Sequence, residues 1–112
     1  MNTERNLKDF PANDNGDVLW RMFCSGDNLA KPREIEFFLT FPEESAALDC
    51  ARLLLQSRHR ISLAPHHGKW QLAIYPYMQP THENITNFEV FLESSAAPLG
   101  GENDGWECFE QS

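Results

Sequence analysis

The most regular alternation of apolar and polar residues runs over residues 33–41. One side of this run carries Ile35, Phe37, Leu39 and Phe41. The other side carries Glu34, Glu36, Phe38 and Thr40. A period of two residues indicates a β-strand with one buried face, because successive side chains of a strand point to opposite faces. Pro42 lacks the backbone N–H that a central strand donates, so we expect the strand to end there.

Two longer segments repeat their apolar residues every three or four positions, as an α-helix with one buried face does. The first segment runs from about Glu43 to Ser57, and its apolar stripe consists of Ala47, Leu48, Ala51, Leu54 and Leu55. The second runs from the N-cap residue Thr81 to about Ala97, and its stripe consists of Ile85, Phe88, Leu92 and Ala96. A shorter stripe over residues 18–23, with Asp17 as N-cap and Gly26 as the stop, predicts a leading helix of about two turns.

A β-hairpin is predicted between the two long helices. Ile61 and Leu63 alternate with polar residues, and the return strand does the same at Trp70, Leu72 and Ile74. The turn is expected in Pro65-His66-His67-Gly68-Lys69. After the last helix, Asn103-Asp104-Gly105 has the composition of a tight turn, and we expect it to precede a short strand from Trp106 to Phe109.

The predicted elements follow the order helix, then β-α-β-β-α-β, which is the split βαβ pattern. We therefore predict an α+β, ferredoxin-like sandwich: a four-stranded antiparallel sheet with two helices on one face, plus a short N-terminal helix. The length of 112 residues fits one domain. Residues 16–112 would form that domain, and the polar residues 1–15 a loose N-terminal arm.

Charge narrows the choice of partner. Nine Lys and Arg residues against 17 Asp and Glu residues give a formal net charge of −8. Such a charge disfavours direct contact with nucleic acid or an anionic membrane and favours a basic protein partner. Residues 1–10 lack the apolar core of a secretory signal, and no apolar run approaches the roughly 20 residues that span a bilayer. We therefore expect a cytoplasmic protein.

The cysteines and histidines do not form a recognisable reactive motif. Cys24, Cys50 and Cys108 are far apart, and we expect small buried or half-buried residues in a reducing compartment. The run His82-Glu83-Asn84-Ile85-Thr86 begins like the zinc-protease motif H-E-x-x-H, but Thr86 stands where the second ligand must be. We predict no catalytic residue, no cofactor and no metal. The alternative class is a small-ligand or metal-binding domain, a hydrolase among the possibilities, that would use His59, His66, His67 or His82.

The sheet face opposite the helices is a candidate partner site, because it would combine aromatic and acidic side chains. These are Glu34, Glu36, Phe38, Tyr75, Glu107 and Phe109. Aromatic residues on an open sheet face resemble an RNA-stacking platform, but carboxylates among them repel phosphates. A basic protein segment fits this composition better. The competing interpretation is structural, with the leading helix packed over the aromatic residues.

Three segments also carry a resemblance to a known family. They are Gly68-Lys69-Trp70, the run from Pro80 to Thr86, and the run from Gly100 to Glu107. Over about Val18 to Glu110 the chain resembles the RraB family, regulators of ribonuclease E activity. The most specific block is Asp104-Gly105-Trp106, although Asn103 stands where members often carry a tyrosine. The resemblance implies a ferredoxin-like fold and a bacterial, non-enzymatic inhibitor that binds the noncatalytic scaffold region of ribonuclease E and restrains RNA decay.

The residues that carry the resemblance also have a structural interpretation. They are Thr81, His82, Glu83, Asp104, Gly105 and Trp106. Thr81 would cap the last helix, and Glu83 would lie favourably near its positive end. Asp104 and Gly105 would turn the chain, and Trp106 would anchor the final strand by burying its ring. None of these roles requires a bound ligand.

Overall fold

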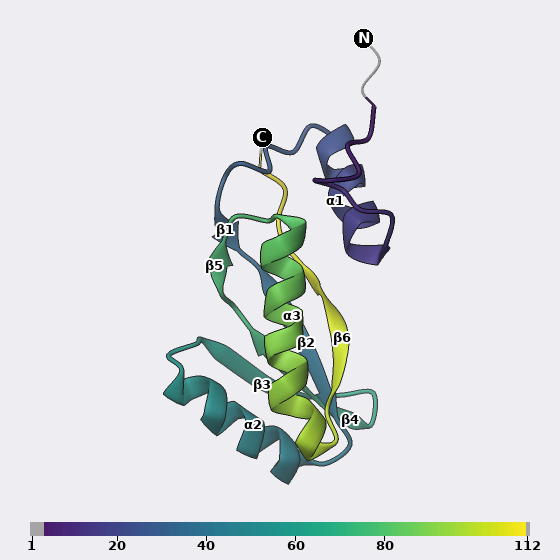
Figure 1. Ribbon diagram of the computed structural model, residues 1–112. Coiled ribbons are helices and arrows are strands. Elements are labelled where there is room, and N and C mark those ends of the chain that lie inside the picture. The colour runs from purple at the N-terminus through teal and green to yellow at the C-terminus, as the bar shows by residue number, and fades with distance from the viewer. Residues whose placement is uncertain (1–3, 112) are drawn as a thin grey trace.

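The computed structural model describes residues 4–111, which form a mixed α/β structure with three α-helices and two antiparallel sheets (Figure 1). The elements are α1 (Asp14–Cys24), β1 (Arg33–Glu34), β2 (Glu36–Phe41), α2 (Glu44–Gln56), β3 (Ile61–His66), β4 (Lys69–Ile74), β5 (Tyr77–Met78), α3 (His82–Ala96), the 3₁₀ turn η1 (Ala97–Leu99) and β6 (Glu102–Glu107). Within this part of the chain, no helix has the length and apolar character needed to cross a membrane.

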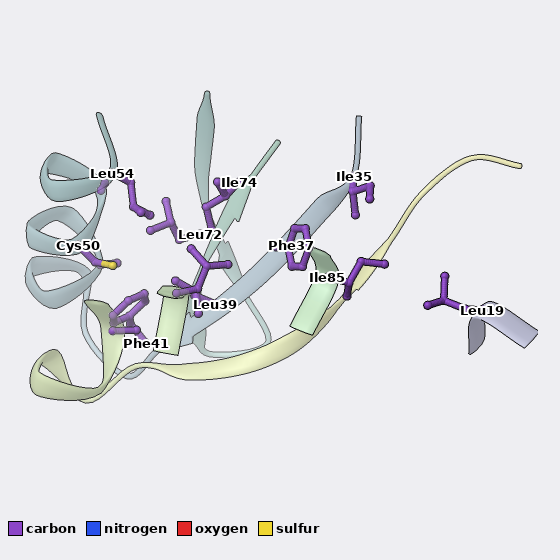
Figure 2. Packing of buried hydrophobic residues seen from close by; sticks show 14 residues of the cluster. Leu19, Ile35, Phe37, Leu39, Phe41, Cys50, Leu54, Leu72, Ile74 and Ile85 are labelled. Carbon is purple, nitrogen blue, oxygen red and sulfur yellow. The ribbon is translucent and has the colours of Figure 1, made fainter. Parts of the chain in front are cut away.

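The larger sheet has the strand order β3-β4-β2-β6, and every neighbouring pair is antiparallel. A separate pair joins β1 to β5. The alternation predicted for β2 is confirmed, since Phe37, Leu39 and Phe41 are fully buried. They share one core cluster with buried side chains of both α2 and α3, so the two long helices cover the same sheet face. Figure 2 shows Cys50 and Leu54 beside the sheet at one end of this cluster, and Ile85 nearer the other.

The two long helices begin and end almost where the sequence predicts. The Thr81 hydroxyl accepts a hydrogen bond from the Asn84 backbone N–H at 3.1 Å, which confirms the cap of α3. In α2, Ala47, Ala51 and Leu54 are buried as predicted. The fourth buried residue is Cys50, which was not part of the predicted stripe. Leu48 and Leu55 are instead 38% and 56% exposed. Each follows a buried residue directly, and one residue turns a helix by about 100°, which moves both leucines off the buried face.

Helix α1 begins earlier and packs elsewhere than predicted. Its N-cap is Asn13, whose side chain accepts from the Gly16 N–H at 3.0 Å, so the prediction of Asp17 as the cap is wrong. The helix contacts α3 and lies at one end of a molecule that measures 53 × 23 × 23 Å (Figure 1). The interpretation in which this helix covers the open sheet face is therefore wrong. Leu19 is the residue of α1 that joins the core cluster with full burial.

The first and the last of the strands predicted from the sequence need correction. The run over residues 33–41 divides into β1 and β2 at Ile35. The backbone N–H of Ile35 donates to Pro76 O at 2.9 Å in the register that both strand pairs share, but Pro76 has no N–H to return the bond. The last strand runs over Glu102–Glu107 and not from Trp106 to Phe109, so Asn103-Asp104-Gly105 lies inside β6 and is not a turn before it. Phe37 pairs with Trp106 and Leu39 with Asn103, which leaves two residues of β6 opposite Phe38. This is a β-bulge, and Gly105 supplies its φ of +94°.

The predicted hairpin is confirmed, with longer strands and a shorter turn. Strands β3 and β4 pair up to His66 and Lys69, so the turn consists of His67 and Gly68 alone. Their φ angles are 51° and 76°. Positive φ at both central residues is typical of the two-residue turns that join twisted antiparallel strands.

Candidate functional site

Four of the six predicted partner-site residues come together at one end of the open sheet face. Glu34, Glu36, Glu107 and Phe109 line a hollow of about 230 Å³, together with Cys108. Glu36 and Glu107 lie directly opposite each other in the β2–β6 register. We call this group the acidic hollow. Within residues 4–111, neither Glu36 nor Glu107 forms an ion pair, so both carboxylates are available to a cation.

Phe109 gives the acidic hollow an apolar contact point. Its side chain is 86% exposed. Aromatic residues are enriched at protein interfaces relative to the remaining surface, so this exposed ring is a candidate contact for a partner.

The other two predicted residues, Phe38 and Tyr75, lie on the open face outside the hollow. Phe38 is half-buried and pairs with Ala73 of β4. The Tyr75 hydroxyl lies 2.8 Å from Ser62 Oγ, and the Arg60 guanidinium stands 4.8 Å from the centre of the Tyr75 ring. Arg60 also bonds Glu34 at 2.7 Å. Arg60 therefore links Tyr75 to the rim of the acidic hollow and offsets one of its charges.

A buried ion pair fixes the chain around the acidic hollow, and this pair was not predicted. The Arg33 guanidinium makes two hydrogen bonds of 2.8 Å to Asp27, and both residues are 4% exposed. It also donates to Asn28 O and to Phe109 O, each at 3.0 Å. The hydrogen bond to Asp27 raises the pKa of Arg33 above its ordinary value, against the opposing effect of burial. The backbone of Phe109 is thereby held while its ring stays in solvent.

The sequence did contain a sign of this pair. Arg33 stands two residues before Ile35, in phase with the apolar side of the alternation. A charged residue in phase with a buried face requires a partner. What the pattern could not supply was the identity of that partner, because Asp27 lies in an irregular segment.

The residues of the family resemblance at the start of α3 face the N-terminal region of the chain. His82 Nε2 lies 3.0 Å from Asn13 Oδ1, beside the cap of α1. Thr81 caps α3, and Glu83 is exposed in the first turn of that helix. His82 thus connects the starts of two helices.

The second block of the resemblance ties β6 to the helices. Trp106 is half-buried against the core, and its Nε1–H donates to Asn15 Oδ1 at 2.9 Å. The Asn15 amide in turn donates to Glu89 of α3 at 2.6 Å. Asn103 donates to the same Glu89 carboxylate group at 2.7 Å, so Asn103 has its own contact with α3. Asp104 accepts from the Thr40 hydroxyl at 3.1 Å.

The histidines of the alternative hypothesis are dispersed. The rings of His66 and His67 are 4.2 Å apart in the hairpin, whereas His59 packs against Phe88 and His82 lies near α1. Among the described residues, no group of three or more His, Cys, Asp or Glu side chains has the arrangement of a metal site.

The cysteines differ in environment. Cys50 is buried, and burial raises its pKa to about 11. Cys108 is half-buried, and burial raises its pKa as well, against the nearby Arg33 charge. Cys24 is exposed at the end of α1, so the expectation of a buried or half-buried residue is wrong at that position.

Comparison with known proteins places these contacts in a family context. A family model, RraB, described as "Regulator of ribonuclease activity B", matches residues 12–108. The searches of curated proteins and of solved structures gave no match. The matched range extends from the residue before the cap of α1 to Cys108, and so includes the Trp106–Asn15 and His82–Asn13 contacts. The chain therefore belongs to the RraB family, the regulators of ribonuclease activity.

Proposed function

We propose that this protein is a non-enzymatic inhibitor that binds ribonuclease E through the noncatalytic scaffold region of that enzyme and so restrains RNA decay. The family match supports a regulatory role toward a ribonuclease. The proposed inhibition works by occupying a surface that the ribonuclease needs, and it involves no chemical step. A cytoplasmic location, where RNA is degraded, is part of the proposal.

The observation that carries the proposal is the acidic hollow beside Phe109. Glu36 and Glu107 stand opposite each other in neighbouring strands, and Phe109 adds an exposed ring held in place through Arg33. Complementary charge steers a basic segment to such a surface, and a desolvated aromatic anchor contributes much of the binding energy at many interfaces. With a net charge of −8, the protein would bind the ribonuclease itself and not its RNA.

The ferredoxin-like class is part of the same proposal. Strands β2, β3, β4 and β6 stand in the order β3-β4-β2-β6 with antiparallel neighbours. This order supports a split βαβ arrangement, in which each helix crosses between two strands that have another strand between them. It leaves the face away from α2 and α3 open for a partner.

The test uses the full chain and an immobilised scaffold region of ribonuclease E. We expect saturable binding at about micromolar concentration or below, the range of many regulatory interactions, and slower cleavage of a model RNA by the complete ribonuclease. The double variant Glu36→Lys/Glu107→Lys should weaken binding at least about tenfold, because it reverses two charges that face the partner.

The matched control is Glu43→Lys/Glu44→Lys, which makes the same change in net charge at the start of α2, away from the acidic hollow. We expect this control to change binding far less. Absence of binding together with unchanged RNA cleavage would remove the ribonuclease E assignment. Equal losses in the two double variants would instead show that net charge alone, and not the acidic hollow, determines binding.

A further inference from the structure

A second hollow lies at the end of the molecule that carries α1. It has a volume of about 780 Å³, against about 230 Å³ for the acidic hollow, and the two share no lining residue. Its walls come from residues 4–10, the second half of α1, residues 27–30 and residues 79–83. We call it the aromatic hollow.

Three aromatic rings in mutual contact form one wall. Phe10 lies 5.3 Å from Trp20 and 5.4 Å from Phe23, measured between ring centres. Trp20 and Phe23 are stacked, with centres 5.7 Å apart and an angle of 19° between the ring planes. Phe23 is 42% exposed. The hollow therefore presents a ring surface to solvent inside a concavity.

Local contacts hold this wall in place. Arg5 donates to Phe10 O at 2.9 Å and to Pro11 O at 2.6 Å, and it forms an ion pair with Asp17 of α1 at 2.8 Å. Gly16 is buried directly against Pro11, where a side chain would collide with the backbone. The segment that carries Phe10 is thus fastened to α1, and the ring is positioned before any ligand arrives.

The lining is also acidic. Glu4, Asp9 and Glu83 contribute carboxylates. Asp27 lines the hollow too, but its charge is paired with Arg33. The basic lining residues are Lys8 and His82. Three carboxylates not paired with Arg33 therefore share this lining with Lys8 and His82.

We propose that the aromatic hollow binds arginine side chains of a basic protein segment. A guanidinium group is planar, stacks on tryptophan and phenylalanine rings, and pairs with carboxylates through several donors at once. A lysine ammonium is also attracted to a ring face, but it is not planar, so it cannot stack on the ring or pair with a carboxylate through a flat fork of donors. The aromatic hollow lies outside the acidic hollow of the proposed function. This proposal does not depend on which ribonuclease segment binds to the acidic hollow.

The test titrates the full chain into the fluorescein-labelled peptide Gly-Arg-Gly-Arg-Gly-Arg-Gly and follows fluorescence anisotropy. Versions with lysine or with the neutral isostere citrulline replace all three arginines. We expect the arginine peptide to bind about threefold or more tighter than the lysine peptide, the scale of a partly desolvated cation–π contact. The citrulline peptide should show no saturable binding.

Substitutions in the aromatic hollow test whether the arginine peptide binds there. Phe23→Ser and Trp20→Leu should each weaken binding of the arginine peptide by about three- to tenfold. Phe91→Ser is the matched control, since Phe91 is a helical phenylalanine of similar exposure (38%) that does not line the hollow. If Trp20→Leu lowers the melting temperature, the double variant Asp9→Asn/Glu83→Gln replaces it as the test. Both residues are exposed, so we expect a loss of affinity for the arginine peptide with the aromatic rings unchanged.

Several outcomes would overturn the proposal. One is the absence of saturable binding of the arginine peptide, and another is equal affinity for the lysine peptide. A third is unchanged affinity in Phe23→Ser and in Asp9→Asn/Glu83→Gln. A loss seen only in Glu36→Gln/Glu107→Gln would move the peptide to the acidic hollow, which would support the proposed function while removing this second surface.

Discussion

Arg33 is a charged residue that the fold buries at the point where three segments meet. Its guanidinium bonds Asp27 and Asn28 of the loop after α1, and Phe109 of the segment after β6. A buried ion pair is tolerated when its remaining donors are satisfied, because the charges otherwise lose their hydration without compensation. The additional bonds to backbone carbonyls fulfil that condition, and they connect the ion pair to the position of Phe109.

We therefore predict that Arg33→Met lowers the free energy of unfolding by about 3–5 kcal/mol, because it leaves the Asp27 carboxylate buried and unpaired. Urea unfolding followed by far-ultraviolet circular dichroism measures the loss. The double variant Arg33→Met/Asp27→Leu should recover part of it, since no buried charge remains. A loss below about 1 kcal/mol in the single variant would contradict the buried pair.

Reactivity of the three thiols provides a second prediction at this scale. Iodoacetamide near pH 8 should alkylate Cys24 first, because it is exposed and the thiolate is the reactive form. Cys108 should react more slowly, and Cys50 only after unfolding, since burial keeps both thiols protonated. Peptide mapping by mass spectrometry reads the order. In denaturant all three should react alike, and early modification of Cys50 in the folded protein would be inconsistent with its burial.

The raised pKa of Cys50 also gives the sign of a pH effect. The folded state holds the proton up to about pH 11, whereas the unfolded thiol loses it near its ordinary value of 9.0. The contribution of Cys50 to stability is therefore complete below pH 9.0 and decreases as the pH rises toward 11. The decrease in this window should be smaller in Cys50→Ala than in the unmodified protein.

At the scale of elements, β6 shows why one sequence pattern supports two structures. Asn103-Asp104-Gly105 was expected to form a turn, and it forms a bulge inside the strand. Both structures need a residue with positive φ, which Gly105 supplies in either case. The sequence Asn-Asp-Gly indicates a residue with positive φ. Whether that residue lies in a turn or in a bulge depends on pairing with β2, which is a contact between distant parts of the chain.

Patterns that depend on local spacing, in helices and in strand β2, were more predictive. Thr81 begins α3 as expected, and the alternation over β2 assigns Phe37, Leu39 and Phe41 to the core correctly. The contacts of α1 were not predictable in this way. Asn13 and Asn15 bond His82 and Trp106, which lie 69 and 91 residues away in the sequence.

The candidate site was predictable to a similar extent. Alternation placed Glu36 and Glu107 on the open face, and strand register then brought them opposite each other. The aromatic hollow was missed, because its wall depends on residues 4–10 folding back on α1. Short polar segments without a period give no indication of such contacts.

Trp106 and its neighbour Glu107 should respond in opposite ways to substitution. Trp106→Ala should lower the free energy of unfolding by about 3 kcal/mol, near the lower limit for a large aromatic residue because the ring is only half-buried. Trp106→Phe retains most of the packing and loses the hydrogen bond to Asn15, so about 1 kcal/mol is expected. Glu107→Lys, on the opposite face, should change stability by no more than about 0.5 kcal/mol.

Thermal and urea unfolding of the three variants test this division. A Trp106→Ala protein with an unchanged melting temperature would show that the ring does not anchor β6. Marked destabilisation of Glu107→Lys would show that this carboxylate has a structural role, and it would weaken the assignment of Glu107 to a partner surface.

For the whole molecule, the relevant feature is that charge and shape act together. The chain carries a net charge of −8 on an elongated body of 53 × 23 × 23 Å. The acidic hollow is at the open sheet face, and α2 and α3 cover the other face. A basic partner is attracted to the molecule at long range by the net charge, but at contact it meets a particular pair of carboxylates and one exposed ring.

For the proposed binding of the ribonuclease E scaffold region, this division predicts two separable effects. Affinity should fall as sodium chloride rises from about 0.05 to 0.5 M, because added salt shortens the range of exposed charge interactions. Glu36→Gln/Glu107→Gln should weaken binding and also flatten this salt dependence, since fewer charges remain to be screened. Phe109→Ala should weaken binding by about tenfold or more at every salt concentration without changing the slope, as expected of an apolar anchor. An unchanged slope in the double variant would show that the attraction arises elsewhere on the acidic surface than at the hollow beside Phe109. A changed slope in Phe109→Ala would show that the ring is not a purely apolar anchor.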